Sequence, residues 1–237
     1  VGVLTSDYFN TVSSDDKGYN FDINANYTKR FKIPQQVLSA EFSFSRDNDK
    51  DMTNTFDTYI TPVNQTPSNR NEIENEIDDS YSAQLDYVHP FTKDSKLETG
   101  YRGTYKKRDD DFTVEKFDYA LNRFMIDYNS SNRFIYKEQI HGAYAIFTQQ
   151  LGSFGFSLGS RIEQTIIKGE LVNPNQVFDR NYIDFFPSAS VSQKLSKTSE
   201  LQLSYARRVN RPRQGQLNPF ISVSMMGGSN SLSQGNP

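Results

Sequence analysis

The chain has 237 residues, of which 26 are basic and 29 acidic, giving a formal charge of -3, and it contains no cysteine. The charge balance shows no basic excess of the kind that indicates nucleic-acid binding. Without cysteine, disulfides, thiolate metal sites and thiol catalysis are excluded. No apolar run reaches the length of about 18 residues that a transmembrane helix needs. Only 35% of the residues are hydrophobic, yet 14% are aromatic, and disordered chains are poor in aromatic residues.

Apolar and polar residues alternate along the chain with a period of two. Between Tyr19 and Thr28 every odd position is apolar or aromatic and every even position is polar, which is the pattern of a strand with two different faces. The same alternation predicts eight strands of about ten residues each. These are Tyr19–Thr28, Val37–Arg46, Ser80–His89, Leu97–Lys106, Gln139–Thr148, Phe154–Ile166, Phe185–Gln193 and Leu201–Asn210.

The predicted connections alternate between short and long. Short ones lie near Lys32–Gln36, Pro90–Ser95, Gln150–Ser153 and Leu195–Ser199, and long polar ones near Asp47–Asp79, Arg108–Lys137, Lys168–Asn181 and from Pro212 onward. This order is typical of an all-β, antiparallel up-and-down transmembrane β-barrel, in which tight turns lie on the periplasmic side and long loops on the outside.

Aromatic residues gather at both ends of the predicted strands. Phe31, Phe91 and Phe154 flank the short turns, and Tyr19, Tyr81 and Tyr105 lie toward the long loops, as the two aromatic girdles of a membrane barrel would. A soluble β-sandwich, whose strands also alternate, is the alternative. Its strands are usually shorter, about five to six residues.

More specific motifs occupy the C-terminal third. Residues 201–212 read LQLSYARRVNRP, followed by QLNPFI at 216–221 and GNP at 235–237, and preceded by GSRIE at 159–163 and FDRNYIDFFPS at 178–188. This succession resembles the barrel portion of TonB-dependent outer-membrane receptors, and within them the outer-membrane β-barrel family. The resemblance is specific from about Gly159 onward and extends only to strand patterning before it.

The resemblance implies a barrel of about 22 strands with an N-terminal plug that is energised through TonB. We expect residues 1–237 to form one part of such a barrel, about eight of its strands, with no plug domain or TonB box inside the chain. The implied function is uptake of a nutrient ligand across the bacterial outer membrane. A non-transporting barrel protein with a structural or partner-binding role is the alternative. The implied partners are outer-membrane lipid, TonB through a plug outside the chain, and a surface lipoprotein.

We predict no enzymatic activity and no catalytic, cofactor-binding or metal-binding residue. His141 falls on the polar side of its predicted strand and is expected to face the lumen, where a hydrolase would need it, but an ordinary polar lumen residue is the preferred interpretation. His89 precedes Pro90 and is expected to be an interfacial turn residue. Asp47–Asp51 imitates the start of a calcium loop, but Met52 and Thr58 occupy the positions that need glycine and glutamate.

The remaining candidates are charged or glycine-rich. Arg161 and Glu163 are two residues apart and therefore share a face; with Glu41, Asp86, Glu98, Arg102 and Arg208 they predict a lumen wall of mixed charge that holds the barrel or a plug in place, with substrate contact as the alternative. Lys106–Asp111 predicts a solvated loop base, with contact of its basic half to lipopolysaccharide phosphate as the alternative. Met225–Gly228 predicts a mobile loop or hinge.

Overall fold

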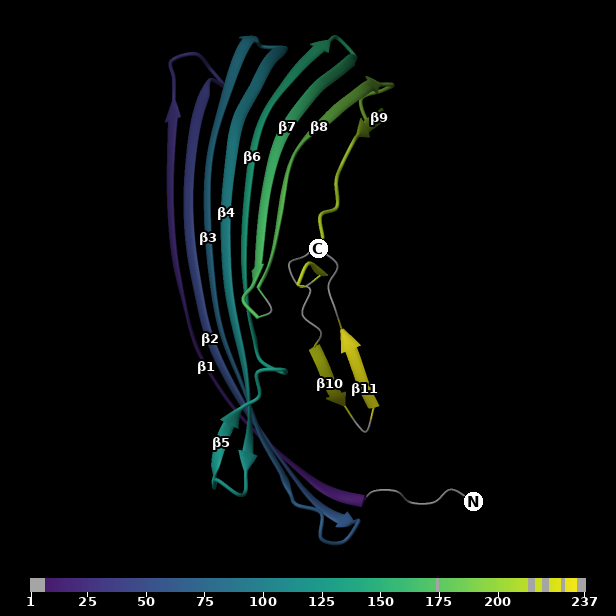
Figure 1. Ribbon diagram of the computed structural model, residues 1–237. Coiled ribbons are helices and arrows are strands. Elements are labelled where there is room, and N and C mark those ends of the chain that lie inside the picture. The colour runs from purple at the N-terminus through teal and green to yellow at the C-terminus, as the bar shows by residue number, and fades with distance from the viewer. Residues whose placement is uncertain (1–6, 174, 213–215, 219–221, 227–228, 234–237) are drawn as a thin grey trace, which may run out of the picture.

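The computed structural model describes residues 7–173, 175–212, 216–218, 222–226 and 229–233. The strands are β1 (Asp7–Arg30), β2 (Val37–Thr61), β3 (Ser68–Thr92), β4 (Ser95–Asp118), β5 (Arg123–Ile126), β6 (Asn132–Leu151), β7 (Phe154–Leu171), β8 (Gln176–Lys194), β9 (Glu200–Ala206), β10 (Ser222–Met226) and β11 (Ser229–Ser233). One antiparallel sheet has the order β1-β2-β3-β4-β6-β7-β8-β9, with β5 paired to the end of β4, while β10 and β11 form a separate hairpin (Figure 1). No helix in these residues is long and apolar enough to cross a membrane.

All eight predicted strands are present, but most are far longer than expected. β2 and β3 each have 25 residues, and β1 and β4 each have 24. The predicted long loop Asp47–Asp79 is therefore wrong, because β2 and β3 stay paired as far as Asp57 and Ser68. The apolar-polar alternation ends once both faces of a strand meet water, although the backbone ladder continues.

The other predicted connections show the same error in part. The segment Arg108–Lys137 holds the rest of β4, the short β5 and the beginning of β6, and Lys168–Asn181 holds the end of β7 and the beginning of β8. In the opposite direction, the last predicted strand ends at Ala206 and not at Asn210. The short turns at residues 31–36, 93–94, 152–153 and 195–199 lie where they were predicted.

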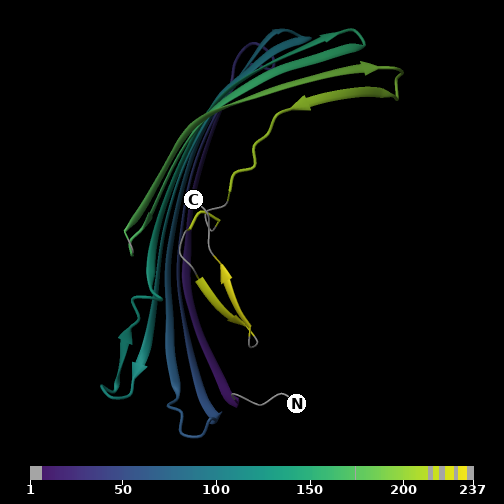
Figure 2. The same cartoon turned by 45° about the vertical axis from the view of Figure 1, so that its right-hand side comes forward.

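The sheet is a single curved layer. Both views show it bending along its length, with the chain after β9 running back along the concave side (Figures 1 and 2). In the described residues β1 and β9 are not paired with each other, so the sheet is open there. The other sheet in the described residues is the two-stranded β10–β11 hairpin, which is too small to be the second layer of a sandwich, and the alternative of a soluble sandwich is therefore wrong.

The strand register brings the apolar residues of all strands to the convex face, called here the outer face. Exposed apolar side chains cover it, such as Ile183 at 69% and Leu203 at 72% exposure. Two rows of rings border this apolar band; Tyr81 and Tyr105 lie in the first as predicted, whereas Tyr19 lies beyond it. The first aromatic row is Phe21, Phe44, Tyr81 and Tyr105, with successive ring centroids 6.2, 4.7 and 5.9 Å apart. The second aromatic row, near the short turns, includes Phe31, Tyr87, His89, Phe91, Phe147 and Phe156, linked by ring contacts of 4.9–6.3 Å.

The height of the band follows from one strand. Tyr81 and His89 lie in the two aromatic rows on β3, and the segment between them is about 26 Å long at ~3.3 Å per residue. A strand tilted by about 40° would then cover about 20 Å, close to the apolar band of membrane barrels. The strands continue beyond the first aromatic row, where both faces of β2 and β3 become mainly polar.

Candidate functional site

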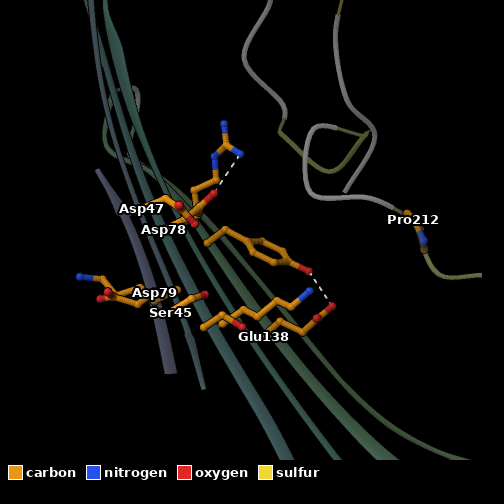
Figure 3. A pocket seen from close by; sticks show the side chains of 11 residues that line it. Ser45, Asp47, Asp78, Asp79, Glu138 and Pro212 are labelled. Carbon is orange, nitrogen blue, oxygen red and sulfur yellow. Dashed lines mark hydrogen bonds and ion pairs between the residues drawn. The ribbon is translucent and has the colours of Figure 1, made fainter. Parts of the chain in front are cut away.

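The concave side, called here the inner face, holds a cavity of about 450 Å³ (Figure 3). Its lining comes from β2, β3, β4 and β6 and from the segment after β9: Ser45, Asp47, Asp78, Asp79, Ser80, Lys106, Lys107, Arg108, Tyr136, Glu138 and Pro212. In the close view Pro212 lies across from the strand residues (Figure 3). The cavity is therefore bounded by the sheet on one side and by the C-terminal segment on the other.

Carboxylates crowd the inner face of β2, β3 and β4 on one side of this cavity. The acidic wall, as we call it, consists of Asp47, Asp49, Asp51, Glu72, Glu74, Glu76, Asp78 and Asp110, which share the inner face by register. Arg108 is the cation at its centre. Its guanidinium donates to the Glu76 carboxylate and, at 3.4 Å, to Oδ2 of Asp78. Two members of the wall, Asp47 and Asp78, line the cavity itself, beside Lys106 and Arg108.

Burial changes the ionisation of this wall, which lies beyond the first aromatic row and outside the apolar band. Burial raises the pKa of Glu76 to about 7, although the Arg108 guanidinium opposes that rise. The pKa of Glu74 is raised by burial and then by the nearby Asp110 carboxylate. Burial likewise raises the pKa of Asp110, against the effect of Arg108. Near neutral pH the wall therefore carries less negative charge than its composition suggests.

Glu74, Glu76 and Asp110 are the residues of this wall that could hold a metal ion. Carboxylate oxygens of the three lie within 4.8 Å of one another, and hard divalent cations take oxygen ligands. Arg108 already supplies a positive charge to Glu76. The expected absence of a metal site stays a prediction.

On β6, β7 and β8 the inner face is apolar at the same height. Phe134, Tyr136, Ile167 and Leu171 form a buried cluster with Leu217 of the C-terminal segment, and Phe178 packs against it; we call this set the aromatic wall. Gly169 lies between Tyr136 and Phe178 in the register, and a Cβ there would collide with the Phe178 ring. Glycine at this position therefore lets the rings close over the strand.

A charged network lies deeper on the inner face, at the level of the apolar band. Arg161 Nε and Arg211 Nη2 each lie 2.5 Å from a different Glu163 carboxylate oxygen. Gly142 lies opposite Glu163, and a Cβ at Gly142 would collide with the Arg161 guanidinium. Arg211 was not predicted as a member of this network, because it follows β9 and has no strand parity that could place it.

The predicted wall of mixed charge is confirmed in part. Glu41 and Arg102 lie at the level of Glu163 on the inner face. On the same face Asp86 accepts a hydrogen bond of 2.7 Å from the Tyr144 hydroxyl, and Glu98 pairs with Lys96 at 3.0 Å. Arg208 lies beyond the end of β9 and is exposed, so its predicted place in the strand is wrong.

His141 lies on the outer face, and the prediction that it faces the lumen is wrong. The register places His141 opposite Gly103 and Gln164, and its Nδ1 is 2.7 Å from the Tyr101 hydroxyl. The parity was misjudged because both sides of β6 carry apolar residues, with Ile140 facing inward. Only the pairing of β6 with β4 and β7 determines which of its residues face the outer side of the sheet and which face the inner side.

The calcium-like run Asp47–Asp51 lies inside β2 and is extended. Because successive residues of a strand point to opposite faces, this run cannot wrap around one ion as a calcium loop does. The run Lys106–Asp111 likewise belongs to β4, so the predicted solvated loop base is wrong. His89 lies near the end of β3, with its ring 4.9 Å from that of Phe91.

Parts of the predicted C-terminal motifs lie outside the described residues. Met225 and Met226 belong to β10, whereas Gly227 and Gly228 lie outside the described residues. The same holds for residues 219–221 and 235–237 of the sequence motifs. The predicted hinge therefore stays a prediction.

An antiparallel sheet with an apolar band between two aromatic rows on one face and polar residues on the other is the wall of a transmembrane β-barrel. A family model described as the outer membrane protein beta-barrel family matches residues 29–237. The chain belongs to this family and is a protein of the bacterial outer membrane. A search of curated proteins found no match to it.

Several solved structures are similar to the chain. The ferric citrate transporter FecA in its unliganded form is 12% identical, over 70% of this chain and 26% of that chain, with a TM-score of 0.41. BauA, the ferric preacinetobactin receptor from Acinetobacter baumannii, is 14% identical over 79% of this chain and 29% of that chain, with a TM-score of 0.44. FyuA, the ferric yersiniabactin uptake receptor from Yersinia pestis, is 11% identical over 68% and 26%, with a TM-score of 0.37. The chain thus spans less than a third of these structures.

Proposed function

We propose that the chain is part of a TonB-dependent outer-membrane receptor that takes up a nutrient ligand, and that the ligand contacts the inner face beyond the first aromatic row. The observation that carries the proposal is the cavity of about 450 Å³ between the acidic wall and the C-terminal segment. In a closed barrel this cavity faces the lumen. The proposal requires a plug and a TonB box elsewhere in the protein.

Two features of the cavity support ligand contact over a purely structural role. Binding sites combine apolar surface with a few well-placed polar groups, and here Tyr136 meets Asp78 and Arg108 in one lining. The chain has no residue to which we assign a chemical step. We therefore propose a receptor that binds and passes its ligand without changing it.

Nutrient depletion from a defined medium tests the proposal. Cells with and without the whole protein are grown on a mixture of saccharides, peptides and metal chelates, and mass spectrometry follows each compound in the medium. The same comparison is made in cells that lack TonB. We expect at least one compound class to be depleted only when both the protein and TonB are present. Equal depletion in all four strains contradicts the proposal and favours the non-transporting barrel.

The inner-face cavity is tested by Asp78→Asn together with Arg108→Gln, with Asn24→Asp as the control. Asn24 also faces inward but lies within the apolar band on β1, outside the cavity lining. We expect the cavity variant to slow depletion about tenfold, since a hydrogen bond to a charged group contributes about 1.5–3 kcal/mol and water screens part of that at this partly exposed pair. An unchanged rate places the ligand contacts elsewhere.

A further inference from the structure

Three lysines lie side by side on the outer face, directly beyond the first aromatic row. The register aligns one residue from each of six strands at this level: Arg46, Asp79, Lys107, Lys137, Lys168 and Asp179. Lys107, Lys137 and Lys168 therefore occupy neighbouring positions on β4, β6 and β7. Like charges directly opposite each other on paired strands are destabilising, so this row needs compensation.

The nearby carboxylates compensate the arginines better than the lysines. Arg46 holds Asp79 through two hydrogen bonds of 2.6 and 2.8 Å, and Arg133 holds Asp109 through two of 2.7 Å.

The lysine contacts are longer or missing. The Lys107 ammonium is 3.9 Å from Asp109 and the Lys168 ammonium 3.7 Å from Asp179. Among the described residues Lys137 has no carboxylate oxygen within 4.0 Å, although Glu170 lies one level further out on the neighbouring strand. With the Lys168 side chain 61% exposed, the row can accept an external anion.

Within the two levels beneath this row, the apolar band carries polar side chains on β6, β7 and β8. Gln139, Gln164 and Asn181 lie on the outer face there, with the Gln164 amide donating to Asn181 at 3.2 Å. At the same two levels β1, β2 and β3 carry Ile23, Ala25, Phe42, Phe44, Tyr81 and Ala83. Polar groups are costly on a lipid-facing surface, so their presence on β6, β7 and β8 at these two levels, where β1–β3 are apolar or aromatic, points to a polar group in the lipid at this place.

We infer that Lys107, Lys137 and Lys168 bind the phosphate groups of an anionic lipid of the outer leaflet. The lysine row is on the side of the band opposite the short turns, and the short turns of such barrels face the periplasm. Acyl chains would pack on the band while phosphates reach the ammonium groups, and Gln139 and Gln164 would contact the polar linkage between them. The run Lys106–Arg108 contributes only Lys107, because Lys106 and Arg108 face inward.

The test uses the whole protein in detergent, titrated with diphosphorylated lipid A and followed by native mass spectrometry, with a chelator present so that no divalent cation bridges lipid to carboxylates. The variant carries Lys107→Gln, Lys137→Gln and Lys168→Gln. A control carries Lys17→Gln, Lys29→Gln and Lys50→Gln, which remove the same charge from the outer face of β1 and β2. A third protein carries arginine at the three row positions.

We expect the glutamine variant to bind lipid A about 100-fold more weakly, since each basic residue at a charged membrane surface contributes about a fivefold factor. The control and the arginine variant should stay within about threefold of the unchanged protein, and dephosphorylated lipid A should bind weakly to all four. Equal loss in variant and control, or equal binding of the dephosphorylated lipid, overturns the inference. Competition by inorganic phosphate at equal concentration overturns the assignment to a lipid.

Discussion

The acidic wall of β2–β4 and the aromatic wall of β6–β8 occupy the same face of one sheet at the same height, yet they are stabilised differently. In the acidic wall the side chains remain partly hydrated and are organised around Arg108. In the aromatic wall five side chains, including Leu217, form a buried cluster. Six hydrophobic side chains are buried in the described residues, and five of them belong to this cluster.

The difference between the two walls shows where apolar side chains on the inner face of a barrel sheet can become buried. A single sheet has no second layer, so apolar side chains on its inner face become buried only where another segment covers them. Leu217 provides that cover on β6 and β7. Among the described residues no buried apolar cluster covers the carboxylates of β2–β4, and two of them, Asp47 and Asp78, line the cavity. In the described residues, contact with the C-terminal segment therefore buries the inner face of β6 and β7, whereas the inner face of β2–β4 remains accessible to water.

The largest expected effect comes from breaking the aromatic wall. Phe134→Ala removes a ring that is 2% exposed, and we expect it to lower the free energy of unfolding by about 3 kcal/mol, since a buried phenylalanine leaves a cavity. Urea unfolding of the whole protein in phospholipid vesicles measures the change. Glu74→Ala, which truncates the acidic wall, is the matched variant and should have little effect. Equal losses would mean that the two walls do not differ in packing.

A smaller effect is expected from removing the cation of the acidic wall. Arg108→Met deprives Glu76 and Asp78 of their hydrogen-bond donor, and we expect a loss of about 2 kcal/mol because charged partners are left without compensation. The control is Lys17→Met, which removes an exposed ion pair with Asp15 and should change stability by less than about 0.5 kcal/mol. If the two variants lose the same stability, Arg108 does not organise the wall.

The smallest effect is a pH dependence that belongs to the acidic wall alone. The pKa of Glu76 is raised to about 7 in the folded protein from an ordinary value of 4.5, so between these values the folded state holds more protons than the unfolded state. Stability should therefore fall as the pH rises from about 4.5 to 7, by ~1 kcal/mol after allowing for solvent screening. Unfolding titrations at several pH values measure this slope. Glu76→Gln should reduce it, since Glu74 and Asp110, whose pKa values burial also raises, remain, and Phe134→Ala should leave it unchanged.

Much of the fold could be predicted from residues such as Tyr19–Thr28, where five apolar and five polar positions alternate. Such a segment has one arrangement that satisfies both its faces, a strand between an apolar and a polar environment. The eight strands, the short turns and the two aromatic rows follow from this pattern. The extensions of β2 and β3 could not be predicted in this way, because their side chains are polar on both faces and only pairing with a neighbour keeps them extended.

The sequence by itself predicted the class of protein, because a period of two in polarity, strands of about ten residues and rings near both ends of several strands favour the wall of a membrane barrel over a soluble sandwich. Only the tertiary structure decided which residues share a face where the parity is ambiguous. His141 moved to the outer face because of its pairing with Gly103 and Gln164. Glu163 gained Arg211 from a segment without any period. Contacts between residues far apart in the chain depend on register and on the path of the covering segment, and neither leaves a periodic trace in the sequence.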